Sequence, residues 1–178
     1  MRYLLLVLLS ALLDALIATA IPAQAAESPA HVGRHTSTPE DQRDIRQVVA
    51  DFQAALKAKD IHKLASLMLH SDIEWVSPPS PENLKKIRES YDPNANGLRA
   101  GGFRDFVRFI RESKVPVEER FYNLKITQDK HVAWVMFDYE FVEDGKVWNH
   151  GIESWQMLKN IDGKWKIANV WWSTNMLQ

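Results

Sequence analysis

The sequence contains no cysteine, and its 178 residues carry nearly equal numbers of basic and acidic side chains, 22 and 23. The absence of cysteine excludes disulfide bonds, thiolate metal sites, a cysteine nucleophile and a lipid-modified N-terminal cysteine. The net charge of −1 gives no basic excess for binding nucleic acid, and no acidic run could act as a solvating tail. Because the sequence also lacks a glycine-rich phosphate loop, a serine nucleophile motif and a metal-ligand cluster, we predict no cofactor and no metal.

The chain is rich in apolar and aromatic residues. Hydrophobic residues make up 46% of it, which is enough for the core of one domain of ordinary size. Seven tryptophans is a high number for this length, and each buries a large area while carrying a single hydrogen-bond donor. This composition predicts either a thick aromatic core or a pocket lined by aromatic rings.

The first 25 residues have the pattern of a secretory signal peptide. Arg2 supplies a short positive segment, Leu4 to Ile17 form an apolar stretch, and Ala23-Gln24-Ala25 places small residues where signal peptidase needs them. Asp14 departs from this pattern, because a charge is costly inside the apolar stretch. We therefore expect an exported protein, either periplasmic or secreted.

An uncleaved membrane anchor is the alternative for this segment. Its uninterrupted apolar runs are too short to span a hydrocarbon core of about 30 Å, and Pro22 breaks the helix before the cleavage site. We expect cleavage after Ala25 and no stable membrane association afterwards. Residues 26–37 lack periodicity and are predicted to be a flexible leader, and residues 38–178 to form one domain.

Helix-start signals and apolar spacing predict the N-terminal part of this domain. Thr38 is a predicted N-cap with Pro39 at the first helical position, and the helical spacing ends near Lys59. Asp60 is the predicted cap of a second short helix. Further along, we expect a strand at 73–76, a short helix near 82–89 and a helix beginning at Phe103.

Strong alternation of apolar and polar residues predicts a four-stranded meander in the C-terminal half. The turns are expected at Gln128-Asp129-Lys130, Asp144-Gly145 and Asp162-Gly163, because these residue types tolerate positive φ. The strands are expected at 118–127, 131–142, 146–159 and 164–174. Helices followed by such a meander define an α+β domain.

Several segments carry a resemblance to the nuclear transport factor 2-like (SnoaL-like) superfamily. They are 55–60 with Leu64 and Leu67, Asp72–Pro78, Val132–Val135, Gly151–Trp155, and the hairpin Asp162–Ser173 with its Asp-Gly-Lys-Trp-Lys-Ile run. The resemblance covers roughly residues 39–178. It implies a cystatin-like cone in which a curved antiparallel sheet wraps over the N-terminal helices, with a pocket at the open end. It also implies that dimers through the outer sheet face are common, but it does not imply one activity. The stretch 77–101 departs from the compact pattern of the superfamily.

Placing tight turns at these signals predicts which side chains share a face of the sheet. In each hairpin the numbers of two directly paired residues then have a constant sum, which is 259, 289 and 323 for the three hairpins in chain order. The face toward the helices would carry Leu124, Ile126, Ala133, Val135, Phe137, Ile152, Leu158, Trp165, Ile167 and Trp171. The outer face would carry Trp134, Trp155 and Trp172 among charged residues, which suits a homodimer interface.

The same register predicts a polar row on the inner face, with one side chain from each strand. The row consists of Arg120, Tyr139, His150 and Ser173, and opposed side chains lie about 4.5–5.5 Å apart. Polar groups on an apolar concave wall suit a ligand site. The alternative is a hydrogen-bond network that only satisfies its own members or water at the mouth of the cone.

Other candidate residues have simpler structural explanations. Asn169 could bind a ligand carbonyl or a neighbouring side chain, and Trp75, Trp148 and Trp171 could line the pocket or pack in the core. His70 with Asp72 could be an acid–base pair or part of a solvated turn. His31 and His35 lie in the leader, where no fixed scaffold would hold a metal.

Three functions are compatible with these residues. The first is binding of a small, partly apolar molecule in a cone-shaped pocket without catalysis. The second is a cofactor-independent isomerase, dehydratase or cyclase, in which His150 would be the general base and Tyr139 and Arg120 would stabilise an oxyanion. The third is a structural dimer whose cone is filled by its own side chains.

The signal peptide leads to a direct prediction. N-terminal sequencing of the exported protein should begin at Ala26, because the small residues at 23 and 25 fit the peptidase site. An exported product that retains Met1 would contradict this prediction.

Overall fold

The structure is a computed structural model that describes residues 28–97 and 100–177. The chain divides into two compact units at Arg34, and the described part of the first unit, residues 28–34, holds a turn in which the Val32 amide donates to the Pro29 carbonyl. The predicted signal peptide lies outside the described residues. Among the described residues, no helix is long and apolar enough to cross a membrane.

The helices of the second unit begin and end at the predicted signals. Helix α1 (Pro39–Ala58) starts at Thr38, whose side chain accepts from the Asp41 amide, and it ends where Lys59 takes a left-handed conformation. Helix α2 (Ile61–Leu67) is capped by the Asp60 side chain. The two later helices are α3 (Pro81–Ser90) and α4 (Phe103–Glu112).

One mixed sheet contains all the strands of the described residues, in the order β2-β1-β6-β5-β4-β3, with β7 also paired to β5. The meander matches the prediction closely: β3 (Val117–Asp129), β4 (Val132–Glu143), β5 (Lys146–Lys159) and β6 (Trp165–Trp172) are antiparallel neighbours. The meander is antiparallel as expected, and the whole sheet is mixed because β1 (Glu74–Val76) runs parallel to β6. Two short strands, β2 (Ala100–Gly102) and β7 (Asn175–Met176), extend it.

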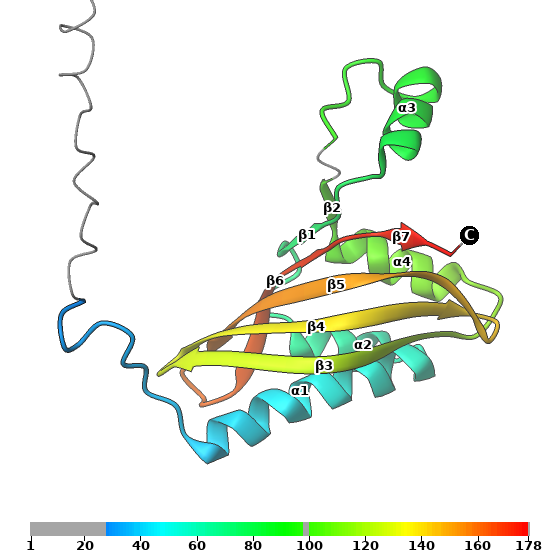
Figure 1. Cartoon of the computed structure of the whole chain (residues 1–178). Helices are drawn as coiled ribbons and strands as arrows, with labels where there is room; N and C mark the ends of the chain where they lie inside the picture. Colours follow the sequence, from blue (N-terminus) through cyan, green and yellow to red (C-terminus); the bar gives the residue numbers. More distant parts are fainter. Residues whose placement is uncertain (1–27, 98–99, 178) are drawn as a thin grey trace, which may run out of the picture. The chain divides into compact units, whose positions relative to one another are not determined.

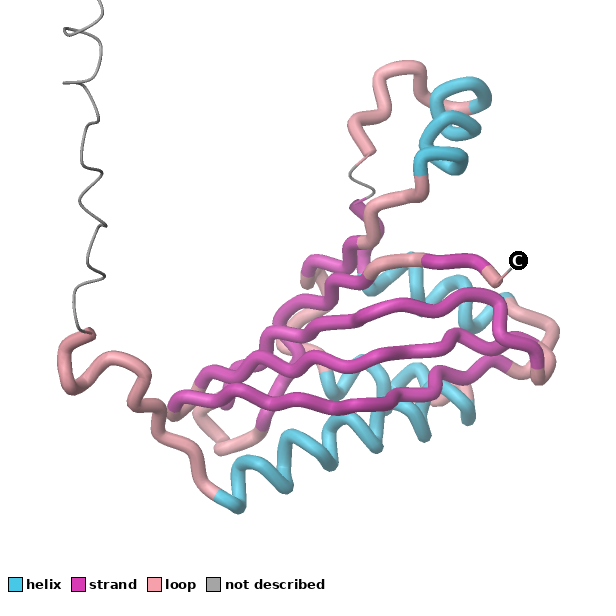
Figure 2. The backbone as a smooth tube through the Cα atoms, viewed as in Figure 1, coloured by secondary structure: helices cyan, strands magenta, loops and turns pink. Residues whose placement is uncertain are grey.

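The helices α1, α2 and α4 lie on one face of the curved sheet (Figures 1 and 2). Between these layers the core is aromatic rather than hollow. Phe52 of α1 meets the Trp155 ring edge-on with a centroid distance of 5.1 Å, and Phe137 meets Trp155 at 5.0 Å and 90°. Trp75 joins the same core through Phe106, at 4.7 Å. Much of the space that a cone would enclose is thus filled by the protein's own rings.

The predicted strand register is wrong by one or two residues in each hairpin. In the first hairpin the pairs sum to 261 near the turn and to 260 beyond a bulge at Asn123, which has φ of 54°. In the second, the Asp144-Gly145 turn is confirmed with a sum of 289, but an extra residue at Trp148 changes the sum to 290. In the third, the sums are 324 and then 325, because the turn is wider and Ala168 is inserted. Each inserted residue exchanges the two faces beyond it.

These shifts correct the predicted outer face. Trp155 is only 1% exposed, and Trp172 packs against the core, so neither lies on the outer face. Trp134 is 48% exposed there as predicted, and Trp171, expected inside, is 49% exposed. Ile152 and Leu158, also expected inside, are exposed as well. The remaining predicted inner residues, Leu124, Ile126, Ala133, Val135, Phe137, Trp165 and Ile167, do lie in or against the core.

A buried carboxylate joins the beginning of α1 to three strands. Asp41 accepts hydrogen bonds from the Lys159 ammonium at 2.7 Å, the Trp165 indole N–H at 3.0 Å and the Gln128 amide at 2.9 Å. These bonds, that to Lys159 most of all, hold the pKa of Asp41 well below its usual range. Its stabilising effect is therefore present above the ordinary pKa near 3.8 and is lost as the pH falls through the lowered value.

Replacing Asp41 should destabilise the fold more than replacing other acids of the same helix. We expect Asp41→Asn to lower the free energy of unfolding by about 3 kcal/mol at pH 7, because the Lys159 charge loses its partner at a largely buried position. Asp44→Asn, at an exposed position of α1, is the matched control and should change it by less than about 0.5 kcal/mol. Equal effects of the two variants in chemical denaturation would contradict this role.

Candidate functional site

The structure separates the four side chains of the predicted polar row. Tyr139 pairs with Phe121 and Gly151 rather than with Arg120 and His150. Arg120 and His150 instead lie opposite Glu140 on the outer face, and Asn175 of β7 extends their line. A polar row across four strands therefore exists, but it is Arg120, Glu140, His150 and Asn175, and it faces away from the helices.

Tyr139 itself is buried on the inner face of the sheet. Its hydroxyl donates toward the Asn149 side-chain oxygen at 2.8 Å and the Ser173 backbone oxygen at 2.9 Å. Gly151 makes this approach possible, because a Cβ at that position would overlap with the oxygens of Ser173. Ser173 thus touches Tyr139 through its backbone, whereas the predicted row placed it beside His150, and its hydroxyl accepts from the Ile152 amide at 3.0 Å.

Two further acids lie in the core on the same face as Tyr139. Glu119 of β3 is 8% exposed and Glu153 of β5 is 3% exposed. The Trp155 indole N–H donates to Glu153 Oε1 at 2.5 Å. Glu119 Oε2, in contrast, is buried without any hydrogen-bond partner among the described residues. We call Glu119, Glu153 and Tyr139 the inner acid cluster.

Burial dominates the ionisation of this cluster. It raises the pKa of Glu153 from 4.5 to about 8, against the opposing effect of the Trp155 hydrogen bond. Burial and the neighbouring Glu153 charge raise the pKa of Glu119 well above its usual value. Burial also raises the pKa of Tyr139, with contributions from both glutamates. At neutral pH the pair therefore retains at least one proton, so it can both donate and accept hydrogen bonds.

The remaining predicted site residues are dispersed. Trp75 is in the aromatic core, and Trp148 and Trp171 are about half exposed, with the Trp171 indole N–H donating to Glu74 at 3.3 Å. Asn169 donates to the side chain of Gln156 at 2.7 Å, so it makes the contact with a neighbouring side chain that was the alternative to a ligand contact. His70 and Asp72 form an exposed turn, in which His70 Nδ1 accepts from the Asp72 amide. Within residues 28–97 and 100–177, no group of His, Asp or Glu side chains could hold a metal.

Sequence reasoning missed both glutamates of the cluster. Glu153 is one of the charged residues that the predicted register puts on the outer face, because of the error in β5, and Glu119 is placed on neither face. A usable signal was present, because Glu119 lies two residues from Val117 and Phe121, which are core positions of the same strand.

The fold is shared with solved structures of several bacterial proteins. No family model and no curated protein matches the sequence. An NTF2-like protein from Shewanella baltica OS155 superposes with a TM-score of 0.56 at 14% identity, over 80% of this chain and all of that one. An NTF2-like protein from Pseudomonas putida KT2440 gives 0.57 at 11%, over 78% and 89%. A protein with a cystatin-like fold from Nostoc punctiforme gives a TM-score of 0.54 at 14% identity, over 78% of this chain and 93% of that one.

This chain therefore has the NTF2-like, cystatin-like α+β fold, as the resemblance implied. All three relatives are described as proteins of unknown function.

The raised pKa of Glu153 leads to a prediction about stability. Its contribution is fully present below the unfolded pKa near 4.5 and is lost as the pH rises through about 8. At about 1.4 kcal/mol per pKa unit, we expect the free energy of unfolding to fall by on the order of 4 kcal/mol between pH 5 and pH 9.

Glu153→Gln should remove most of this slope, because the amide can still accept from Trp155 but cannot ionise. Glu89→Gln, on the exposed side of α3, is the control and should keep the slope. If the free energy of unfolding of Glu153→Gln falls with pH as steeply as that of the wild type, another group is responsible for the slope.

Proposed function

We propose that this protein binds a small, partly apolar molecule without catalysis, and that the inner acid cluster is its polar anchor. The observation that carries the proposal is the carboxyl oxygen Glu119 Oε2, which is buried without a partner beside a second buried acid. Leaving such a group unsatisfied costs about 1–3 kcal/mol or more. A ligand hydroxyl or amine that donates to this oxygen would offset that cost.

The surroundings of the cluster suit such a ligand. The inner wall is aromatic, with the rings of Phe121 and Phe137 tilted by 35° at a centroid distance of 4.1 Å and Trp155 against both, which favours an apolar body. Thr174 follows the Ser173 carbonyl that Tyr139 contacts, and its hydroxyl lies 2.9 Å from that of Ser77. Ser77, Asn149 and Thr174 are half-buried polar residues on the Tyr139 side of the cluster.

Proton transfer on an apolar carbonyl compound, by an isomerase, dehydratase or cyclase, is the second candidate. It is favoured by the pKa of Glu153 near 8, since a general acid or base works best when its pKa is close to the working pH. The base would then be a glutamate of the cluster rather than His150, which lies on the other face. This candidate differs from binding alone in predicting catalysed exchange of ketone α-hydrogens in D2O.

The proposal also includes export of the mature chain and self-association through the outer face. An apolar patch of Trp134, Met136 and Trp171 is exposed on adjacent rows of that face. Such a patch on a sheet favours burial against a second copy.

We expect a dimer in sedimentation that Trp134→Arg converts to folded monomer. Trp148 is half exposed outside the patch, so Trp148→Arg should leave the protein a dimer. A wild type that is monomeric at tens of micromolar would contradict this.

Native mass spectrometry of the purified protein tests the binding proposal. We expect a co-purifying molecule whose occupancy falls at least about tenfold in Glu119→Gln, because the amide replaces one carboxyl oxygen by an NH2 group that cannot accept a hydrogen bond from the ligand. Glu89→Gln should retain it. Since Gln at 119 removes an ionisable group from the core, the variant should stay folded, which thermal unfolding verifies. Equal occupancy in Glu119→Gln and Glu89→Gln would rule out the cluster as the anchor.

A further inference from the structure

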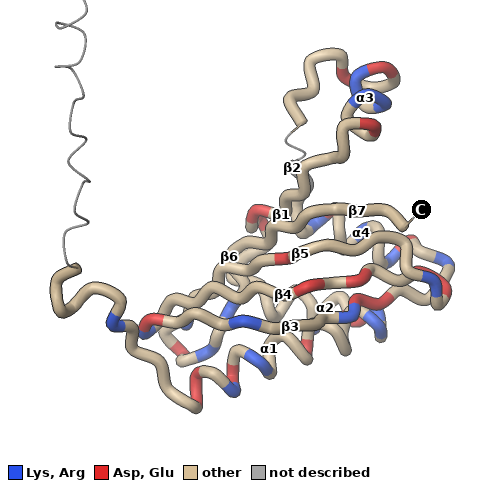
Figure 3. Tube along the Cα trace, viewed as in Figure 1, with Lys and Arg blue, Asp and Glu red and all other residues tan. Residues whose placement is uncertain are grey.

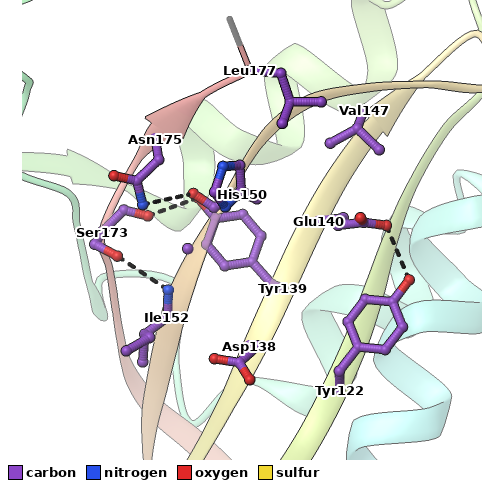
Figure 4. Close-up of a pocket in the computed structure, with 11 residues that line it drawn as sticks. Tyr122, Asp138, Tyr139, Glu140, Val147, His150, Ile152, Ser173, Asn175 and Leu177 are labelled. Atoms are coloured by element: carbon purple, nitrogen blue, oxygen red, sulfur yellow. Dashed lines mark hydrogen bonds between the residues drawn. The ribbon is translucent and has the colours of Figure 1, made fainter.

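A groove of about 570 Å³ lies on the outer face of the sheet, on the side opposite the helices (Figure 4). Two neighbouring rows of the register build it. Tyr122, Asp138 and Ile152 form one row, and Glu140 and His150 form the next. Leu177, which follows β7, closes the end of the groove beside His150. The volume falls in the range of small-molecule sites, and the groove shares only Tyr139 with the inner acid cluster.

The charges in the groove are predominantly negative, and acidic residues recur along β4 (Figure 3). Asp138 and Glu140 point into the groove from one strand. Asn123 donates to Asp138 Oδ2 at 2.6 Å and Tyr122 donates to Glu140 Oε2 at 2.9 Å, so both carboxylates are held in place. In the part of the chain that the structure describes, no hydrogen bond reaches Asp138 Oδ1 or Glu140 Oε1. One acceptor oxygen of each carboxylate is thus open to a ligand.

One cation, Arg120, forms an ion pair with Glu140 and offsets the charge of this pair only in part. The Arg120 guanidinium makes two contacts with Glu118, at 2.9 and 2.5 Å, whereas its distance to Glu140 is 3.8 Å. Arg120 is therefore committed mainly to Glu118. The groove remains an acidic recess between the exposed ring of Tyr122 and the exposed side chains of Ile152 and Leu177.

We propose that this groove is a second binding site, and that its ligand is a small organic cation: an amine with a short aromatic or aliphatic body. The ammonium group would lie between the carboxylates of Asp138 and Glu140, where the face of the Tyr122 ring adds a cation–π contact. The apolar body would lie against Ile152 and Leu177. The apolar patch of Trp134, Met136 and Trp171 lies on the same face, and its row of Met136, Ser154 and Trp171 is next to the row of Asp138 and Ile152 that lines the groove.

Matched probes separate this proposal from nonspecific apolar binding. We would titrate the purified protein with phenethylamine, 2-phenylethanol and 3-phenylpropionate at low salt, following the backbone amides of Gly151 and Ile152 by NMR. The amine should bind at least tenfold more tightly than the alcohol, and the carboxylate should not bind. Equal affinity for the amine and the alcohol, or no shift of these amides with the amine, would overturn the proposal.

Three variants test which charges act. Asp138→Asn with Glu140→Gln should weaken amine binding at least tenfold, and Arg120→Gln should strengthen it, because it removes the competing cation. Asp162→Asn, in the exposed turn at the far end of β5 and β6, should change nothing. Unchanged affinity in the double variant, with its amide spectrum otherwise like the wild type, would overturn the proposal. Occupancy of the inner acid cluster in native mass spectrometry is independent of these results, so each site can fail alone.

Discussion

The alternation of side chains along β4 and β5 decides where every polar group of this protein lies. A side chain on a strand faces either the helices or the opposite surface of the sheet. One inserted residue moves each side chain beyond it to the other face. The bulge at Trp148 places Asn149 beside Tyr139 and sends His150 to the other face. Because Glu153 and Trp155 lie on the same side of that bulge, they enter the core together. The inner acid cluster and the outer groove therefore depend on the same inserted residue.

Local signals in the sequence were sufficient for the elements but not for their register. The caps at Thr38 and Asp60 and the turn at Asp144-Gly145 depend on neighbouring residues only, and all three are found where they were predicted. Bulges at Asn123 and Ala168 depend on packing against strands far away in the sequence, so no local pattern located them. In β6 the register errors of the second and third hairpins offset each other, so Trp165 and Ile167 are buried as expected. Beyond the inserted Ala168 they no longer offset, and Trp171 is exposed.

The candidate site was predicted only in its general chemistry. Tyr139 was correctly placed on the inner wall with polar partners, but those partners are Asn149 and the Ser173 backbone rather than Arg120 and His150. The glutamates could not be identified from the sequence, because charged residues on a strand normally indicate its solvent face. Burial of Glu119 and Glu153 runs against that rule, and such exceptions concentrate at functional sites.

A domain can keep two acids in its core only if other interactions supply enough stability. Here the aromatic rings around Phe52 and Trp155, and the anchor of α1 at Asp41, stabilise the same layers that the acids destabilise. The two kinds of acid respond oppositely to pH, since the pKa of Asp41 is lowered by its partners and that of Glu153 is raised by burial. Stability is therefore greatest in the mildly acidic range, above the titration of Asp41 and below that of Glu153. At higher pH the domain retains the Asp41 anchor while Glu153 gains a charge in the core, which is the physical reason for the loss of stability there.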